Sequence, residues 1–242
     1  MEHGQAKVEA TDKYGRTALF YAALKNKWDV VQWLVESGNV NVEAKDNHGK
    51  AVLHCAVQEN KWDVVQWLVK HGKANVEATD INGRTVLHWA VRGNLHFVQW
   101  LVKYGKANVD AIDNDSRTVL HWAARGNLDV VQWLVEHKKA NVNAIDNYGQ
   151  TVLHCAAQMN KWDVVQWLVE HGADVNVQSN DGKMVLHWAA RSKLHVVQWL
   201  VEHGADVNAT DIDGKTPLKS AEERKHKTIT EYLKKKIVES VS

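Results

Sequence analysis

The chain of 242 residues has very little proline, cysteine or net charge. It holds one proline and two cysteines, and 30 basic against 29 acidic side chains leave a formal charge of +1. A total near zero provides no long-range field for nucleic acid or for a charged membrane surface. The sequence also has neither an apolar run of about 18 residues nor a charged-then-apolar leader. We therefore predict a cytoplasmic monomer that binds neither nucleic acid nor membrane, with the nucleus as the alternative location.

The two cysteines, Cys55 and Cys155, occupy the same place in repeated segments three units apart. Packed helices lie about 10 Å apart, so three stacked units would separate these thiols by roughly 30 Å, too far for a disulfide. We expect small, buried, reduced side chains and not a redox or metal pair. No other feature of the sequence indicates a cofactor.

Repetition is what the sequence has in abundance. The dipeptide Leu-His recurs at Leu53, Leu87, Leu120, Leu153 and Leu186. The pentapeptide Val-Gln-Trp-Leu-Val recurs at Val31, Val65, Val98, Val131, Val165 and Val197. A spacing of about 32 to 34 residues is typical of a stacked solenoid, in which each unit packs on its neighbours.

Each unit contains the same local signals in the same order. A glycine-containing turn such as Asp80-Ile81-Asn82-Gly83 comes first, and a short helix headed by threonine follows, as at Thr85. A second helix then carries Val, Trp and Leu on one side, as in residues 129–136, and ends near a glycine such as Gly172. These signals predict two helices per unit, joined to the next unit by a projecting loop.

The combined pattern Asp-x-x-Gly-x-Thr-x-Leu-His-x-Ala-Ala, Val-Val-x-x-Leu and Gly-Ala-Asp-Val-Asn closely resembles the ankyrin repeat over nearly the whole chain. The resemblance implies an all-α solenoid of helix-turn-helix units with β-hairpin fingers, stacked into a curved array that binds partners on its concave face. The expected divisions are the end of a truncated repeat at 1–10, repeats at 11–44, 45–78, 79–111, 112–144, 145–177 and 178–209, and a capping repeat at 210–242.

Some residues depart from the family pattern. The usual proline after threonine occurs only as Pro217, and Lys138 replaces the glycine at a helix end. If Lys138 is left-handed, we expect roughly 1 kcal/mol of strain there. The first four units carry one extra residue before the finger, as at Lys73, and we expect a bulge to accommodate it.

Five of the fourteen histidines share one repeat position: His54, His88, His121, His154 and His187. Stacked units about 10 Å apart cannot bring two of these rings to one zinc ion at about 2 Å. We predict instead that each ring links its own threonine hydroxyl to the backbone of an adjacent finger. A second set, which includes His71 and His171, lies in the last turn of a helix, where a cation complements the helix dipole.

Twelve tryptophans are unusual for this length. Six form a ladder in the second helices, and the others alternate between two places. Units with Trp62 or Trp162 at the start of the second helix have Cys55 or Cys155 in the first, whereas units such as that of Trp89 carry the indole in the first helix. We interpret this as a volume exchange within a close-packed core, which we favour over an aromatic ligand cage.

The candidates for partner binding are residues that vary between units at positions the fold does not need. They lie at the finger tips and at the ends of the first helices: Lys13, Tyr14, Arg16, His48, Lys50, Asn82, Arg84, Arg92, Asp115, Arg117, Arg125, Tyr148, Gln150, Gln158, Met159, Lys183 and Arg191. The row of finger cations could hold an acidic peptide. We favour the alternative that these cations keep the fingers soluble, because aspartates in the same fingers offset their charge.

No Ser-His-Asp or Cys-His set has a reason to converge, and no glycine-rich loop has phosphate-binding spacing. We therefore expect no enzyme activity, no cofactor and no metal. The predicted function is a scaffold that binds another protein or peptide on its concave face. The alternatives are a regulatory or targeting segment of an enzyme or channel whose catalytic part is N-terminal, and an engineered array; the start in mid-repeat is compatible with a fragment.

Overall fold

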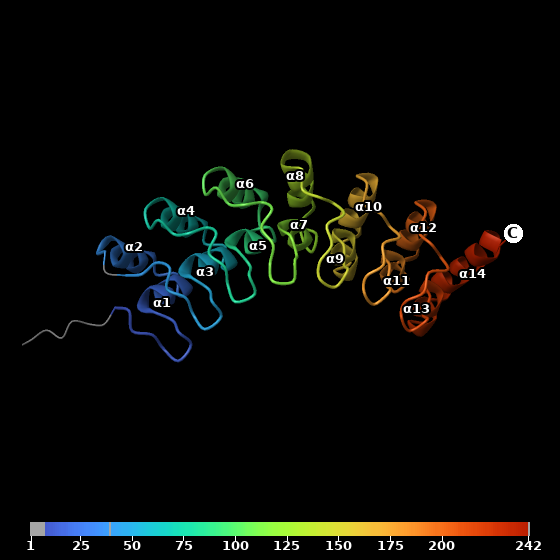
Figure 1. Ribbon diagram of the computed structural model, residues 1–242, viewed down its shortest axis with the longest axis horizontal. Helices are drawn as coiled ribbons and strands as arrows, with labels where there is room; N and C mark the ends of the chain where they lie inside the picture. Colours follow the sequence, from blue (N-terminus) through green and yellow to red (C-terminus); the bar gives the residue numbers. More distant parts are fainter. Residues whose placement is uncertain (1–7, 39, 242) are drawn as a thin grey trace, which may run out of the picture. The chain divides into compact units, whose positions relative to one another are not determined.

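The computed structural model describes residues 8–38 and 40–241 and divides into two compact units, residues 1–114 and 115–242. Both units are built from helix pairs joined by loops (Figure 1). The first unit holds α1 (Ala18–Leu24), α2 (Trp28–Glu36), α3 (Val52–Gln58), α4 (Trp62–Lys70), α5 (Val86–Ala90) and α6 (Leu95–Lys103). The second holds α7 (Val119–Ala123), α8 (Leu128–Lys138), α9 (Val152–Gln158), α10 (Trp162–Glu170), α11 (Val185–Ala189), α12 (Leu194–Glu202), α13 (Pro217–Glu223) and α14 (Lys227–Val241). The predicted all-α repeat solenoid is confirmed.

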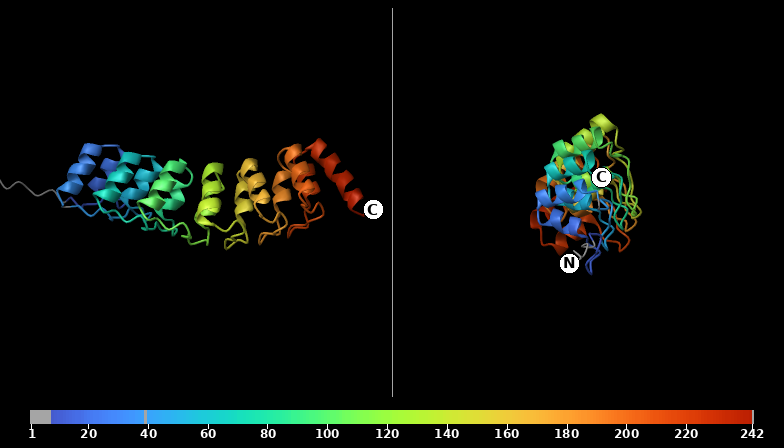
Figure 2. Two further views of the ribbon diagram at one scale, coloured as in Figure 1. Left: turned by 90° about the horizontal axis from the view of Figure 1, so that it is seen from above. Right: turned by 90° about the vertical axis from the view of Figure 1, so that its left-hand side faces the viewer.

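The helices of each unit lie in two rows (Figure 1). In the first unit α3 packs against both α1 and α5, and α4 packs behind α3. In the second, α9 packs against α7 and α11, and α11 against α13. We call the row of first helices the inner helices and the other row the outer helices. The loops between repeats, here called fingers, project from one side of the helices within each unit (Figure 2).

The inner helices begin where the threonines predicted them to begin. Thr17 accepts a hydrogen bond from the backbone N–H of Phe20 at 3.4 Å, and Thr216 accepts one from that of Lys219 at 3.1 Å. These hydroxyls satisfy amides that the first helical turn leaves free. Two lengths of inner helix occur, seven residues in α3 and α9 but five in α5, α7 and α11. The longer form ends in a turn with a left-handed asparagine, Asn60 or Asn160.

The core is aliphatic, because valine, leucine and alanine fill the space between neighbouring repeats. Leu87, Leu101 and Val98 are completely buried. No tryptophan of the described residues belongs to this core, and Trp33 is 66% exposed. The alternating indoles that we expected in a close-packed core are therefore only half-buried, and the volume exchange between them stays a prediction. Short helices in close contact leave room for branched aliphatic side chains, whereas the larger indoles lie at the edge of this core.

The ends of several outer helices also differ from expectation. Lys138 belongs to α8 and the left-handed residue is Lys139, with φ of 58°. Lys73 likewise adopts a left-handed conformation, after Gly72. A Cβ on Gly72 would lie 2.8 Å from the carbonyl oxygen of Leu68, so this glycine permits close approach to the helix. The extra residue of these repeats is thus absorbed by a left-handed lysine and not by a β-bulge.

The fingers contain almost no regular strand. The isolated bridges within residues 8–38 and 40–241 include one that pairs Thr79 with Thr85 and one that pairs Ile145 with Thr151. Tight turns replace the longer hairpin ladder that the resemblance implied. In one of them Asp80 donates its backbone N–H to the carbonyl of Arg84 at 3.1 Å, and Gly83 donates to the carbonyl of Asp80 at 3.0 Å. The predicted remnant of a repeat at residues 1–10 lies mostly outside the described residues.

Candidate functional site

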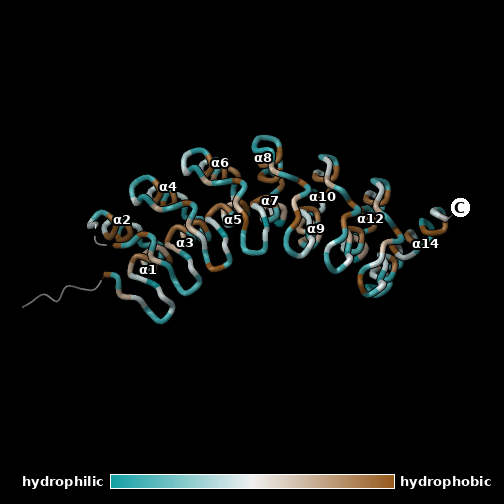
Figure 3. The backbone as a smooth tube through the Cα atoms, viewed as in Figure 1, coloured by the Kyte–Doolittle hydropathy of each residue, from teal (hydrophilic) through white to brown (hydrophobic). Residues whose placement is uncertain are grey.

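Neighbouring finger tips are joined by backbone hydrogen bonds within each unit. In the first unit the N–H of Asn47 donates to the carbonyl of Tyr14 at 2.9 Å, and that of Ile81 donates to His48 at 3.1 Å. In the second unit Asn180 donates to Tyr148 at 2.9 Å in the same way. The finger tips are also largely hydrophilic (Figure 3). Each unit therefore presents a row of polar loop tips whose spacing is held by the backbone.

Buried aspartates at the base of the fingers fix the shape of each turn. Asp80 is only 5% exposed, and its carboxylate accepts hydrogen bonds from the backbone N–H groups of Asn82 and Arg84 at 2.9 and 3.0 Å. Its partner is the Arg84 guanidinium at 2.7 Å. Burial alone would raise the pKa of Asp80, but the Arg84 contacts and the backbone donors outweigh it, and the pKa is lowered.

The row of finger cations is largely engaged within the fingers. Arg16 pairs with Asp12 at 3.0 Å and Lys183 with Asp181 at 2.6 Å. Arg117 contacts two carboxylates, those of Asp115 at 3.2 Å and Asp146 at 3.1 Å. Aspartates therefore neutralise these charges locally, as expected from their presence in the same fingers. Binding of an acidic peptide along this row stays a prediction without support from the geometry.

The residues predicted to contact a partner all keep solvent-exposed surface. The finger tips contribute Lys13, Tyr14, Arg16, His48, Lys50, Asn82, Arg84, Asp115, Arg117, Tyr148, Gln150 and Lys183. The inner-helix ends contribute Arg92, Arg125, Gln158, Met159 and Arg191. Lys50 lies between the two groups, because its ammonium donates to the amide oxygen of Gln58 at 2.7 Å. The two groups are thus adjacent within a repeat, and their exposure leaves them available to a partner.

The rings of His121, His154 and His187 connect their inner helices to the next finger through Nε2 and a backbone carbonyl, as predicted. Nε2 of His54 has no hydrogen-bond partner among the described residues, so the predicted link is not made in every repeat. The backbone N–H of Thr151 donates to Nδ1 of His154 at 3.2 Å, and Nε2 lies 2.9 Å from the carbonyl oxygen of Lys183 in the following finger. Because Nδ1 accepts, Nε2 carries the proton and donates to that carbonyl. Burial lowers the pKa of His154, and it lowers those of His54 and His121 in the same way. The rings that make these hydrogen bonds are therefore structural links.

The second histidine set makes ring contacts that the sequence analysis missed. The His171 ring stacks on Trp167 with centroids 3.7 Å apart, and His203 stacks on Trp199 at the same distance. In each case Nδ1 also lies 2.8 Å from the carbonyl oxygen of that tryptophan. The spacing Trp-x-x-x-His was the available signal, because residues four apart are neighbours on one helix face.

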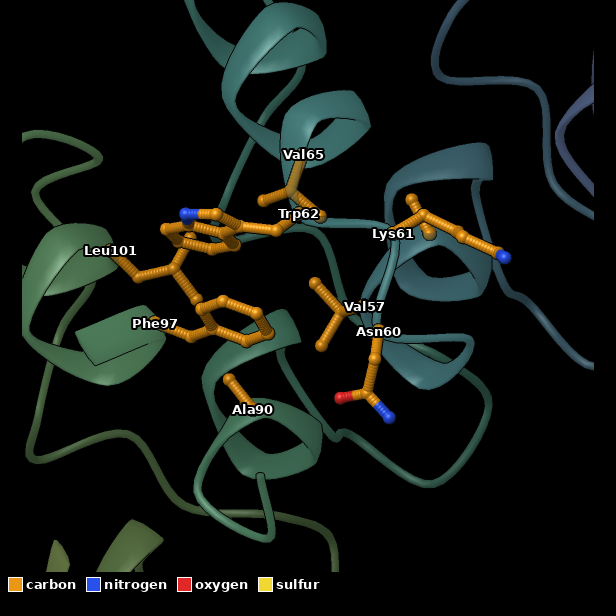
Figure 4. Close-up of a pocket in the computed structure, with 9 residues that line it drawn as sticks. Val57, Asn60, Lys61, Trp62, Val65, Ala90, Phe97 and Leu101 are labelled. Carbon is orange, nitrogen blue, oxygen red and sulfur yellow. The ribbon is translucent and has the colours of Figure 1, made fainter. Parts of the chain in front are cut away.

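An apolar pocket too narrow to hold a water molecule lies between the second and third repeats (Figure 4). The ring of Trp62 stacks on Phe97 with centroids 4.0 Å apart and meets Trp100 edge to face at 5.3 Å. With its amide oxygen turned toward the indoles, Gln66 accepts from both Trp62 and Trp100, at 3.2 and 3.3 Å. This arrangement joins successive outer helices, and we assign the cavity to packing between repeats.

Two further cavities have matching linings, one in each unit. The first indole pocket, of about 260 Å³, is lined by Val57, Gln58, Asn60, Trp89, Arg92 and Gly93. The second indole pocket, of about 280 Å³, is lined by Ala157, Gln158, Asn160, Trp188, Arg191 and Arg224. Both arise where a repeat with cysteine in its inner helix precedes one with tryptophan there. The alternation of the two repeat types was visible in the sequence, but the pockets it creates were not.

The described residues contain no group of three or more His, Cys, Asp or Glu side chains that could hold a metal ion. No helix in the part of the chain that the structure describes is long and apolar enough to cross a membrane. The thiols of Cys55 and Cys155 are both free and buried, and burial raises their pKa values to about 12 and about 11. Neither thiol is therefore poised as a nucleophile.

Comparisons with known proteins agree with this geometry. Among solved structures, the chain is similar to the crystal structure of the ankyrin repeat domain of Bcl-3, described as a unique member of the IkappaB protein family. The two are 31% identical with a TM-score of 0.66, over 92% of this chain and 100% of that chain. The search of curated proteins gave no match. A family model described as ankyrin repeats (3 copies) matches residues 2–80, 38–114, 71–146, 107–179 and 174–240, and the chain therefore belongs to the ankyrin repeat family.

Proposed function

We propose that this chain is a non-enzymatic scaffold that binds another protein or peptide through its finger tips and the ends of its inner helices. Ankyrin repeats are generally protein–protein interaction modules and are typically non-catalytic. The main support for this surface is the difference in burial between the base and the tip of each finger. Asp80 and Asp146 are buried and hold the turns, whereas Tyr14 and Tyr148, at the tips, are 47% and 49% exposed.

Rigid loops with exposed, variable tips are what a recognition surface requires. The backbone bonds between fingers reduce the ordering entropy that a flexible loop would lose on binding. Tyrosine supplies a large contact area with few rotatable bonds and a polar group at its end. The outer helices instead use Trp62 and Trp100 for contacts between repeats. Contacts with the finger side should therefore contribute more binding free energy to a complex than contacts with the outer helices.

Selection from a displayed library of random peptides, using the full chain as bait, tests this function. A finger variant combines Tyr14→Ser, His48→Ser and Tyr148→Ser, all at exposed tips. The matched outer variant combines Trp33→Ser and Tyr104→Ser, which change side chains 66% and 59% exposed on α2 and at the end of α6. Circular dichroism confirms that each variant is folded.

We expect selected peptides to lose at least tenfold in affinity for the finger variant. Their affinity for the outer variant should stay within twofold of the value for the unmodified chain. The proposal is wrong if the selection yields no specific peptide. It is equally wrong if the outer variant, and not the finger variant, abolishes binding.

A further inference from the structure

We infer that the two indole pockets are equivalent subsites for the carboxylate side chains of an acidic peptide. In each pocket the carboxylate would meet an arginine, Arg92 in the first and Arg191 in the second. The inference rests on the proposed function and deepens it, because it names the chemistry of the partner and the residues that recognise it.

The first step of the argument is the repeated composition. Gln58, Asn60, Trp89 and Arg92 line one pocket, and glutamine, asparagine, tryptophan and arginine recur in the other. Asn60 and Asn160 share the left-handed conformation as well, with φ of 53° and 55°. Matching residue types, backbone conformation and volume in two separate units indicate one ligand chemistry for both. Each cavity is large enough for a single side chain.

The second step concerns charge. Arg92, Arg191 and Arg224 are exposed and form no ion pair with a described carboxylate, whereas Arg84 is paired with Asp80. The acidic residues beside Arg224 are engaged elsewhere, since Glu222 pairs with Lys234 at 3.2 Å and Glu223 with Lys215 at 3.0 Å. A carboxylate in either pocket would therefore meet a guanidinium able to make a bidentate contact.

The third step concerns the indoles. The Lys50 ammonium and the Arg84 guanidinium lie 4.4 and 4.3 Å from the centroid of the Trp89 ring. Cations packed against the ring leave less of it for nucleobase stacking, which favours a peptide over single-stranded nucleic acid. In the second pocket, Nε1 of Trp188 is buried and has no hydrogen-bond partner among the described residues. This N–H is closed to solvent, so the donors that a carboxylate would meet in the pocket are the guanidinium groups.

Another repeat junction shows what a subsite requires. Arg125 occupies the repeat position of Arg92, but the next repeat has Cys155 where the two pockets have tryptophan. There the Arg125 guanidinium lies 3.8 Å from the sulfur of Met159 and also contacts the Cys155 thiol. With the indole absent and the guanidinium engaged, this junction lacks the features of the two pockets. It serves as an internal negative control.

Fluorine NMR of the full chain labelled with 5-fluorotryptophan tests the inference. The signals of the two pocket indoles are assigned from the variants Trp89→Phe and Trp188→Phe, and exposed Trp33 on α2 is the reference. The probe is an acetylated, amidated octapeptide of alternating glutamate and serine. The control peptide has glutamine in place of glutamate, and oligo-dT of eight nucleotides tests nucleic acid.

We expect the acidic peptide to shift the Trp89 and Trp188 signals but not that of Trp33. The glutamine peptide should bind at least tenfold more weakly. Arg92→Gln should abolish the shift at Trp89 alone, and Arg191→Gln the shift at Trp188 alone. The second pocket should bind more tightly, because Arg224 adds a cation and Met159 replaces the carboxylate of Glu59.

The inference is overturned if the acidic peptide shifts neither signal, if the two peptides bind equally, or if the arginine variants respond like the unmodified chain. A stronger response to oligo-dT also overturns it, in favour of nucleic-acid binding. Failure of the proposed function looks different, since the peptide selection would then yield no specific binder. A selection that yields peptides without acidic enrichment keeps the scaffold function and contradicts only the subsites.

Discussion

Replacement of Gly149 by alanine should destabilise the second unit through two separable effects. Gly149 has φ of 70°, a conformation that an L side chain adopts only with strain. A Cβ added there would also lie 2.8 Å from the backbone nitrogen of Asn180 and against its amide oxygen. Asn180 is the residue that joins this finger to the next, through its backbone N–H to Tyr148 and its side-chain amide to Asn147 at 3.0 Å.

The magnitude follows from these contacts. Left-handed strain contributes about 1–2 kcal/mol, and loss of two hydrogen bonds contributes roughly 0.5–1.5 kcal/mol each, so the total is roughly 2–5 kcal/mol. Two glycines of the same unit separate the terms. Gly214 has φ of 71° but nothing within 4 Å of an added Cβ, so Gly214→Ala should show the strain alone. Gly126 has neither positive φ nor a neighbour within 4 Å, and Gly126→Ala should be close to neutral.

Urea denaturation followed by circular dichroism measures the three variants. The expected order of destabilisation is Gly149→Ala above Gly214→Ala, with Gly126→Ala near zero. Because the inter-finger bonds couple neighbouring repeats, Gly149→Ala should also broaden the transition, that is, lower its denaturant slope. Equal effects at Gly149 and Gly214 would show that the contact with Asn180 carries no stability. A large effect at Gly126 would refute the reasoning altogether.

Three further predictions concern the histidines, the helix ends and the thiols. The pKa values of His54, His121 and His154 are lowered by burial, so the unfolded chain binds more protons than the folded chain. Stability should therefore fall as pH drops below about 6.5, by up to about 1.4 kcal/mol per pH unit for each ring, and urea titrations at pH 7.5 and 5.5 measure this; equal stability at the two pH values would contradict it. Lys139→Gly should raise the free energy of unfolding by about 1 kcal/mol, because glycine relieves the left-handed strain, whereas Lys138→Gly, inside α8, should lower it by about as much. Thermal melts measure both variants, and the reverse order would contradict the assignment of the helix end. With thiol pKa values of about 12 and about 11, Cys55 and Cys155 should react with a disulfide reagent at pH 8 only as fast as the protein opens, and rapid labelling of the native chain would show that they are accessible.

The sequence alone determined the repeat architecture, because its signals are local and recur in every unit. Thr151 and His154 are three residues apart, and one short helix brings the backbone N–H of one to the ring of the other. Glycine turns, threonine caps and the spacing of Val, Trp and Leu likewise act within a few residues. Because the same local signals recur in successive repeats, each occurrence supports the interpretation of the others. The exposure of the candidate partner residues followed from the same logic, since they occupy positions that the fold does not use.

The tertiary structure alone decided where the large side chains lie and what they enclose. Whether Trp62 enters the core depends on the gap beside the next repeat, and that gap is filled by aliphatic side chains and by stacking on Phe97. Similarly, the left-handed lysine follows from the close approach of Gly72 to the preceding helix turn. The indole pockets form only where two unlike repeats meet, so Trp89 and Arg92 acquire a shared cavity from the neighbour that supplies Gln58. Contacts between repeats join residues about thirty positions apart, and sequence spacing sets which residues meet but not how they pack.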